Sequence, residues 1–141
     1  MKIYLAGKIR NEIEREFLEE IDSVCKSAGF ETFLPHRDVG LAGSIEEVDK
    51  IFEGDIKEGF RDVNLVVAVL DGLHVGAGTA WELGYAYARG IPAIGIKTDE
   101  PVESALEYLS AILIGSMEIV NSKEELGSKL VEFAKQFNQE A

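Results

Sequence analysis

Several residue types are scarce in this 141-residue sequence, and each scarcity argues against a class of protein. Cys25 is the only cysteine, so no disulfide can form within the chain, and we expect a buried thiol in a helix. His36 and His74 are the only histidines and lie far apart, so no metal site and no cofactor is implied. No apolar run is long enough to span a bilayer, and the apolar N-terminal stretch is too short for a signal peptide. We therefore expect a cytoplasmic protein without membrane contact.

Positive charge is also scarce. The sequence has 14 Lys and Arg against 26 Asp and Glu, a formal net charge of -12. A nucleic-acid binder needs a basic face to meet phosphates, so nucleic acid is excluded as a partner. A small anionic ligand is still compatible, because a few local donors can hold one phosphate. The length and the lack of a linker or repeat predict a single domain over residues 1–141.

What the sequence does contain is an alternation of short apolar strands and amphipathic helices. We expect strands at 2–6, 30–34, 65–70, 91–96 and 117–120, a loop at 36–43, and helices at 11–28, 44–60, 79–89, 101–113 and from 122 onward. The last helix is expected to bury Leu126, Leu130, Phe133 and Phe137. Residues 65–70 are continuously apolar, as is typical of a central parallel strand. This order predicts an α/β fold with a five-stranded parallel sheet and helices on both faces.

The carboxyl ends of the strands are the predicted ligand site. In parallel α/β sheets, ligands bind outside these ends. They fall at residues 7–10, 35–37, 71–78 and 97–99, and we expect these segments to meet in space.

A glycine-rich turn at residues 72–84 fails three common templates. No Lys followed by Ser or Thr comes after Gly78, as a P-loop needs, and Trp81 stands where a dinucleotide fingerprint needs glycine. The serine of a nucleophile elbow is absent. Gly76 and Gly78 nevertheless let the backbone come close to a ligand.

Glu82 follows this turn and has two interpretations. A carboxylate near a helix start is kept ionised by the helix dipole, and in a dry cleft it is a usable nucleophile. Thr79-x-x-Glu82 is also a capping box, in which Glu82 only accepts a hydrogen bond from the Thr79 amide. Spacing alone favours the capping role.

Three stretches resemble the nucleoside 2-deoxyribosyltransferase family over nearly the whole chain. They are Tyr4-Leu5-Ala6-Gly7, Asp71-Gly72 and Gly78-Thr79-Ala80-Trp81-Glu82-Leu83-Gly84-Tyr85-Ala86, the last being the most specific. The family fold is a flavodoxin-like three-layer sandwich, in agreement with the pattern above. The resemblance implies that Glu82 attacks the anomeric carbon of a 2'-deoxyribose and expels the base, leaving a covalent intermediate for water or a second base. Tyr4 would orient the Glu82 carboxylate beside the sugar.

Within the family, the sequence leans toward the 2'-deoxynucleoside 5'-monophosphate N-glycosidases. Transferases carry an Asp six residues before the nucleophile, where this chain has Gly76. The loop Gly7-Lys8-Ile9-Arg10 resembles the glycosidase loop, and Arg can grip phosphate with two parallel hydrogen bonds. Residues 109–115 resemble the same branch, in which Ser110 would reach a neighbouring subunit's phosphate site, implying a homo-oligomer of at least two chains. His36 would lie near the base or phosphate.

The resemblance also implies a second carboxylate in the site, for which this sequence offers two candidates. The family carries an Asp in the helix before the central strand, as partner or proton donor for the leaving base. Asp55 is the natural candidate, although its spacing to the strand is one residue longer than the family pattern. A one-residue slip turns a helical side chain by about 100°, which a bulge or longer loop could absorb, and Glu58 is the alternative.

The sequence leaves other functions open. One alternative is a non-catalytic nucleotide-binding or sensing module that uses the same cleft. Another is a glycosidase for a ribosyl or dinucleotide substrate. Base preference and the choice between hydrolysis and transfer are not set by the sequence.

Overall fold

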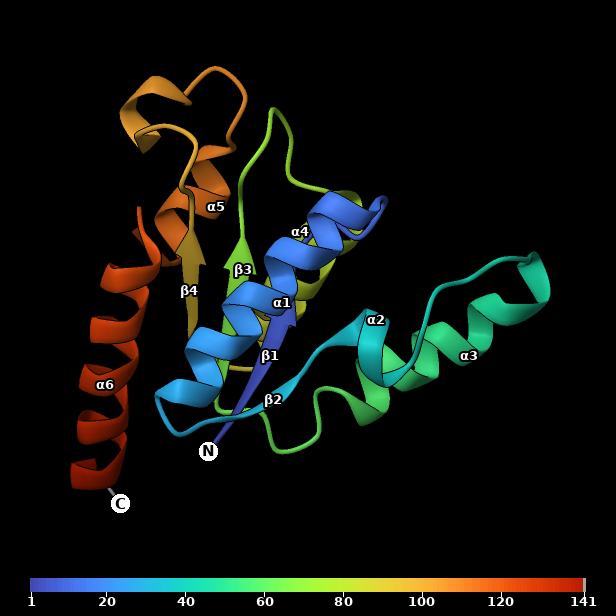
Figure 1. The fold of residues 1–141 in the computed structure, drawn as a ribbon, viewed down its shortest axis with the longest axis horizontal. Coiled ribbons are helices and arrows are strands. Elements are labelled where there is room, and N and C mark those ends of the chain that lie inside the picture. Colours follow the sequence, from blue (N-terminus) through green and yellow to red (C-terminus); the bar gives the residue numbers. More distant parts are fainter. Residues whose placement is uncertain (141) are drawn as a thin grey trace.

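Five short strands form one all-parallel sheet at the centre of the chain, of which the computed structural model describes residues 1–140 (Figure 1). The strands are β1 (Lys2–Ala6), β2 (Glu31–Phe33), β3 (Leu65–Val69), β4 (Ala93–Ile96) and β5 (Glu118–Val120). They pair in the order β2-β1-β3-β4-β5. This is the order of flavodoxin-like sheets, so the predicted α/β fold with five parallel strands is confirmed.

Helices cover both faces of the sheet. Strand side chains alternate in direction, so Ile3 and Leu5 pack with α1 (Glu12–Ser27) and α6 (Lys123–Glu140). Tyr4 and Ala6 face the other way, toward α4 (Ala77–Ala88). Figure 1 shows α1 and α4 on opposite sides of β1 and β3. No helix within residues 1–140 is long and apolar enough to cross a membrane.

The first and last helices follow the predicted patterns closely. Asn11 caps α1 by accepting a hydrogen bond from the Glu14 amide at 2.9 Å, and Cys25 is fully buried on that helix, as expected. In α6, Leu126 and Leu130 are buried. The expected burial of Phe137 is wrong: it is 38% exposed and stacks on Phe133, which is itself only partly buried.

The helix expected over residues 101–113 does not form. The segment makes a single 3₁₀ turn, η3 (Val102–Ser104), and a short later helix, α5 (Ala111–Ser116). Ser110 interrupts the chain between them with an extended backbone (ψ 132°), and its hydroxyl accepts a hydrogen bond from the Ile112 amide at 3.2 Å. The side chain therefore starts a new helix instead of continuing an old one.

Residues 35–60 form an arm that extends to one side of the sheet in Figure 1. The prediction of a loop over residues 36–43 is wrong in its first part, because a short helix, α2 (Pro35–Asp38), forms there. The single helix expected from Ser44 toward Phe60 is instead three joined pieces: η1 (Ile45–Glu47), α3 (Val48–Phe52) and the π-helix η2 (Glu53–Glu58).

The π-helix changes the directions in which later side chains of the arm point, compared with a continuous α-helix. Its hydrogen bonds span five residues, as from the Gly59 amide to the Gly54 carbonyl at 2.9 Å, so the turn holds one residue more than an α-turn. Gly59 makes this possible, because a Cβ there would lie 2.3 Å from the Asp55 carbonyl oxygen and 2.6 Å from the Phe33 ring. A bulge, one of the two ways in which a longer Asp55 spacing could be absorbed, is thus present in the helix before β3.

Replacing Gly59 by alanine tests this packing. The new methyl group would overlap backbone and aromatic atoms, so we expect Gly59→Ala to lower the free energy of unfolding by about 1–3 kcal/mol in urea titrations. Gly127→Ala is the matched control in α6, where a Cβ meets nothing within 4 Å. That variant should gain up to about 1 kcal/mol from helix propensity. Equal effects of the two substitutions would contradict the proposed crowding at Gly59.

Candidate active site

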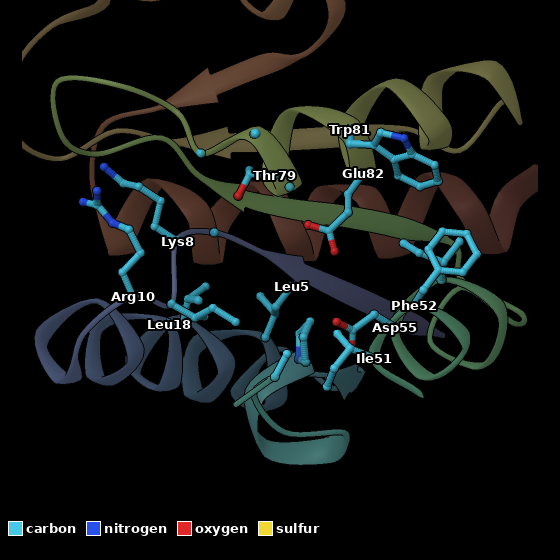
Figure 2. A pocket seen from close by; sticks show the side chains of 18 of the residues that line it. Leu5, Lys8, Arg10, Leu18, Ile51, Phe52, Asp55, Thr79, Trp81 and Glu82 are labelled. Atoms are coloured by element: carbon cyan, nitrogen blue, oxygen red, sulfur yellow. The ribbon is translucent and has the colours of Figure 1, made fainter. Parts of the chain in front are cut away.

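A cavity of about 710 Å³ opens at the carboxyl ends of β1 and β3. This is the point where the strand order reverses, and its volume is in the range of small-molecule sites. Three segments line it: the loop after β1, the start of α4, and the arm formed by α3 and η2 (Figure 2). Eight predicted site residues are among the lining residues: Gly7, Lys8, Ile9, Arg10, Asp55, Gly76, Gly78 and Glu82. Tyr4, His36 and Ser110 are not.

Glu82 extends into this cavity from α4 (Figure 2). The helix begins at Ala77 with Gly76 as its N-cap, two residues earlier than predicted. Thr79 is therefore a buried residue inside the first turn and not the cap, so the capping-box interpretation of Glu82 is wrong. The Glu82 carboxylate instead accepts a hydrogen bond from the Tyr4 hydroxyl.

Burial controls the charge of Glu82. It raises the pKa of the carboxyl group to about 7; the Tyr4 hydrogen bond opposes this rise and the negative charge of Asp55 adds to it. The expectation that the helix dipole keeps Glu82 ionised is thus wrong. Glu82 is the sixth residue of α4, and the dipole acts mainly within the first turn.

Tyr4 supports Glu82 from inside the protein. Its side chain is fully buried on β1 and stacks between Phe60, with ring centroids 4.0 Å apart, and Phe33, at 5.4 Å. Burial and the neighbouring Glu82 carboxylate raise the pKa of Tyr4 far above its usual value, so the phenol stays neutral and donates. The aromatic packing holds the ring in place, and its hydroxyl donates to Glu82.

Asp55 faces Glu82 across the cavity (Figure 2). Burial raises the pKa of Asp55 to about 6, and its Oδ1 atom has no hydrogen-bond partner within residues 1–140. The alternative, Glu58, is exposed, pairs with Arg61 at 3.0 Å and does not line the cavity. Of the two candidates, only Asp55 therefore presents a carboxylate to this space.

Lys8 and Arg10 lie at the end of the cavity away from Phe52 (Figure 2). Lys8 crosses the glycine-rich turn closely: a Cβ on Gly72 would lie 2.5 Å from its Nζ, and one on Gly76 3.0 Å from its Cγ. Gly72 also has a φ of +100°, which favours glycine. The glycines therefore make room for a lysine side chain.

The loop after β4 braces this turn. The Gly72 amide donates to Asp99 Oδ2 at 2.8 Å, and the Thr98 amide donates to Asp71 Oδ1 at 2.9 Å. Lys97, whose side chain is completely buried, pairs with Asp99 at 2.9 Å. Segments 71–78 and 97–99 thus meet as predicted, although the second supports the turn and does not line the cavity.

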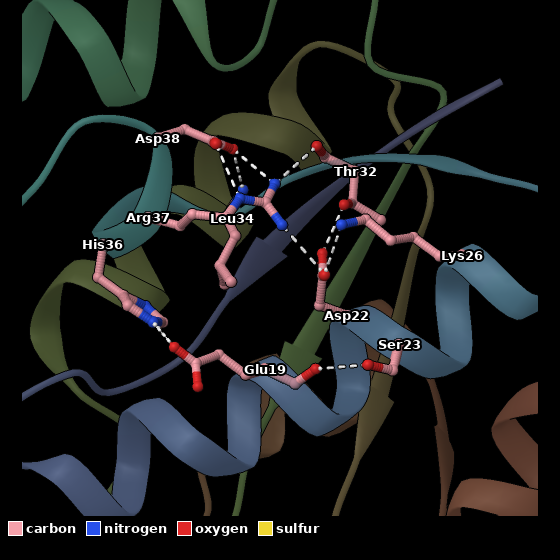
Figure 3. A network of polar contacts seen from close by, with 9 residues as sticks. All are labelled: Glu19, Asp22, Ser23, Lys26, Thr32, Leu34, His36, Arg37 and Asp38. Carbon is pink, nitrogen blue, oxygen red and sulfur yellow. Dashed lines mark hydrogen bonds and ion pairs between the residues drawn. The ribbon is translucent and has the colours of Figure 1, made fainter.

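His36 and Ser110 lie outside the cavity lining. His36 Nε2 is 3.2 Å from Glu19 Oε1 on α1, and its Nδ1 is buried without a partner among residues 1–140 (Figure 3). Next to it, Arg37 joins Asp22 and Asp38, which ties α2 to α1. Ser110 is exposed at the start of α5. In residues 1–140, no three His, Cys, Asp or Glu side chains gather as metal ligands.

Two aromatic residues at the cavity were missed from the sequence. Phe52 and Trp81 meet edge to face with centroids 6.0 Å apart, and 44% and 51% of their surfaces are exposed. Trp81 precedes Glu82 in the motif, which is a usable signal. Phe52 carries no such signal, since its position depends on how the arm packs.

Comparison with known proteins identifies relatives of the whole chain. A family model described as nucleoside 2-deoxyribosyltransferase matches residues 3–137. No curated protein sequence matches.

Three solved structures share the fold. A conserved protein from Enterococcus faecalis has 24% identity and a TM-score of 0.78, with 94% of this chain and 98% of that chain covered. A 2-deoxyribosyltransferase from Bacillus psychrosaccharolyticus has 22% identity and a TM-score of 0.73, with 92% and 96% covered. A CMP N-glycosidase from Clostridium botulinum has 19% identity and a TM-score of 0.56, with 92% and 98% covered.

The raised pKa of Glu82 predicts a pH dependence of stability. The group titrates at about 7 in the folded chain against an ordinary 4.5, so the stability linked to its proton is complete below pH 4.5 and lost as pH rises through 7. The loss by pH 8 is about 3 kcal/mol. Glutamine carries no charge and can still accept from Tyr4, so Glu82→Gln should be more stable than wild type at pH 8 and similar at pH 4.5.

Urea unfolding at the two pH values measures this difference. Glu16→Gln is the control, because Glu16 is exposed on α1 and the substitution changes net charge equally. The control should follow the wild-type pH profile. If Glu82→Gln does so too, Glu82 does not carry the linked proton.

Proposed function

The chain belongs to the nucleoside 2-deoxyribosyltransferase family, and from this premise we propose that it cleaves the N-glycosidic bond of 2'-deoxynucleosides or of their 5'-monophosphates. One observation carries the proposal: a carboxylate hydrogen-bonded to a buried tyrosine faces a second carboxylate across a mostly apolar cavity. Two carboxylates on opposite sides of a sugar are the usual equipment for glycosidic cleavage.

In the first step, ionised Glu82 attacks C1' of the deoxyribose. A carboxylate oxygen forms a bond to C1' while the bond from C1' to the base nitrogen breaks, leaving a covalent deoxyribosyl-Glu82 ester. The Tyr4 hydrogen bond holds the carboxylate in one orientation, which lowers the entropic cost of reaching the attack geometry.

Asp55 supplies the proton for the leaving base. The electron pair of the broken bond stays on the base, and a protonated Asp55 neutralises it. Because burial raises the pKa of Asp55 to about 6 and that of Glu82 to about 7, the pair holds one proton at intermediate pH. The productive form is the minor one, in which Asp55 holds this proton and Glu82 is ionised. Water then attacks C1' and gives its proton to the Asp55 carboxylate, while the bond from C1' to Glu82 breaks and releases the carboxylate. Attack by a second base in place of water gives transfer.

The rest of the cavity suits a nucleotide. Phe52 and Trp81 offer aromatic surface near the two carboxylates for a base, and Lys8 and Arg10 lie at the opposite end, where a 5'-phosphate would extend. Gly76, at the position where transferases have Asp, leaves space for the stem of Lys8. We propose from the family resemblance that exposed Ser110 contributes to the phosphate site of a neighbouring subunit in a homo-oligomer.

Release of free base tests the activity. Each 2'-deoxynucleoside and its 5'-monophosphate is incubated with the protein, with and without an added acceptor base, and products are separated chromatographically. We expect free or exchanged base with wild type and with Glu16→Gln. With Glu82→Gln, turnover should fall by on the order of 10³-fold or more, although the variant folds.

Intact-mass analysis adds a second readout, a deoxyribosyl adduct on Glu82. If no deoxyribose substrate gives free base or base exchange, the enzyme proposal is wrong. Ribose analogues run in parallel separate a ribosyl glycosidase, and binding retained in Glu82→Ala without turnover would favour a sensing module.

The carboxylate pair also predicts the pH profile of kcat/KM. Because Glu82 must be ionised and Asp55 protonated, the profile should be bell-shaped with a maximum near pH 6.5, midway between about 6 and about 7. Asp55→Asn removes the proton donor, so kcat should fall and the basic limb, which follows loss of the Asp55 proton, should disappear while the acidic limb remains. A basic limb that persists in Asp55→Asn would show that Asp55 is not the acid.

A further inference from the structure

The two cations at the far end of the cavity already have an anionic partner in this chain. Glu14, on the first turn of α1, accepts hydrogen bonds from Arg10 at three positions: the backbone amide at 2.9 Å, Nε at 3.3 Å and Nη2 at 2.9 Å. Lys8 Nζ is 4.0 Å from the same carboxylate. The side chains of Glu14 and Lys8 are mostly buried, with 18% and 15% exposed.

This arrangement is more than an ordinary helix cap. Asn11-x-x-Glu14 has the capping-box spacing, and Asn11 accepts from the Glu14 amide as expected. In a capping box, Glu14 would return to the amide of Asn11. Here its carboxylate reaches one residue further, to Arg10, and so lies against the loop that lines the cavity.

The Glu14 carboxylate therefore uses the donors that a 5'-phosphate would need. The Arg10 guanidinium holds the pKa of Glu14 below its usual value, so this group is negative at neutral pH. A phosphate entering the same place must displace Glu14 or lie beside a like charge, and either event costs binding free energy. A substrate that ends in a neutral 5'-hydroxyl meets no such cost.

We propose that Glu14 is a specificity-determining residue: it occupies the anion site formed by Lys8 and Arg10 and biases the enzyme toward 2'-deoxynucleosides over their 5'-monophosphates. This inference rests on the proposed function, because it concerns the substrate range of that same cavity. On this proposal, monophosphates bind less well than nucleosides because Glu14 competes with the phosphate for Lys8 and Arg10. A lack of positive charge in the cavity is not the cause.

Glu14→Gln tests the inference. Glutamine keeps an acceptor for the Arg10 amide and removes the charge, so the ratio of kcat/KM for a 5'-monophosphate to kcat/KM for its nucleoside should rise about fivefold. The rise should come from a lower KM for the monophosphate, with the nucleoside KM unchanged. Glu12→Gln is the control, because Glu12 is exposed in the same helical turn and the substitution changes net charge equally.

An unchanged or lower ratio in folded Glu14→Gln would overturn the inference, as would an equal rise in the Glu12→Gln control. If Glu14→Gln does not fold, Glu14→Ala is measured in the same way. If no variant cleaves any substrate, the proposed function fails separately. Calorimetric titration then decides on Glu14: a 5'-monophosphate should bind Glu14→Gln about fivefold more tightly than wild type, and equal affinities would overturn the inference.

Discussion

The hydrogen bond between Tyr4 and Glu82 is the constraint around which the site is arranged. A buried hydroxyl and a partly buried carboxylate each lose hydration, and the hydrogen bond between them offsets part of that cost. The bond joins strand β1 to helix α4 across the interior of the protein. The same bond keeps a carboxylate with a pKa of about 7 at the wall of a mostly apolar cavity, where water would otherwise have to solvate it.

Much of this architecture could be predicted because it depends on local pattern. Short stretches of sequence are enough to predict the apolar strands, the Asn11 cap and the glycine-rich turn. The parallel sheet then brings Arg10 and Glu82 to the same edge. Features are harder to predict where one side chain has two possible hydrogen-bond partners. The start of α4 at Ala77 instead of Thr79 is one example, and it reversed the interpretation of Glu82.

Other features were hidden because they arise from packing between distant segments. The position of Phe52 depends on the packing of the arm against Trp81, and the pairing of His36 with Glu19 depends on the position of α2 beside α1. Residues 101–113 have helical spacing, yet only a 3₁₀ turn and a separate short helix form there, with Ser110 as the N-cap of the second. The raised pKa of Glu82 likewise follows from burial, which a sequence position near a helix start does not reveal.

The π-helix before β3 has a consequence for how such chains diverge. An added residue in an α-helix normally rotates all later side chains about the helix axis. A site residue on that helix would then point away from its cavity. Here one wide turn, closed by Gly59 against Phe33, holds one residue more than an α-turn, and Asp55 points into the cavity. A turn of this kind can accommodate a one-residue insertion without turning Asp55 away from the cavity, provided that a glycine closes it.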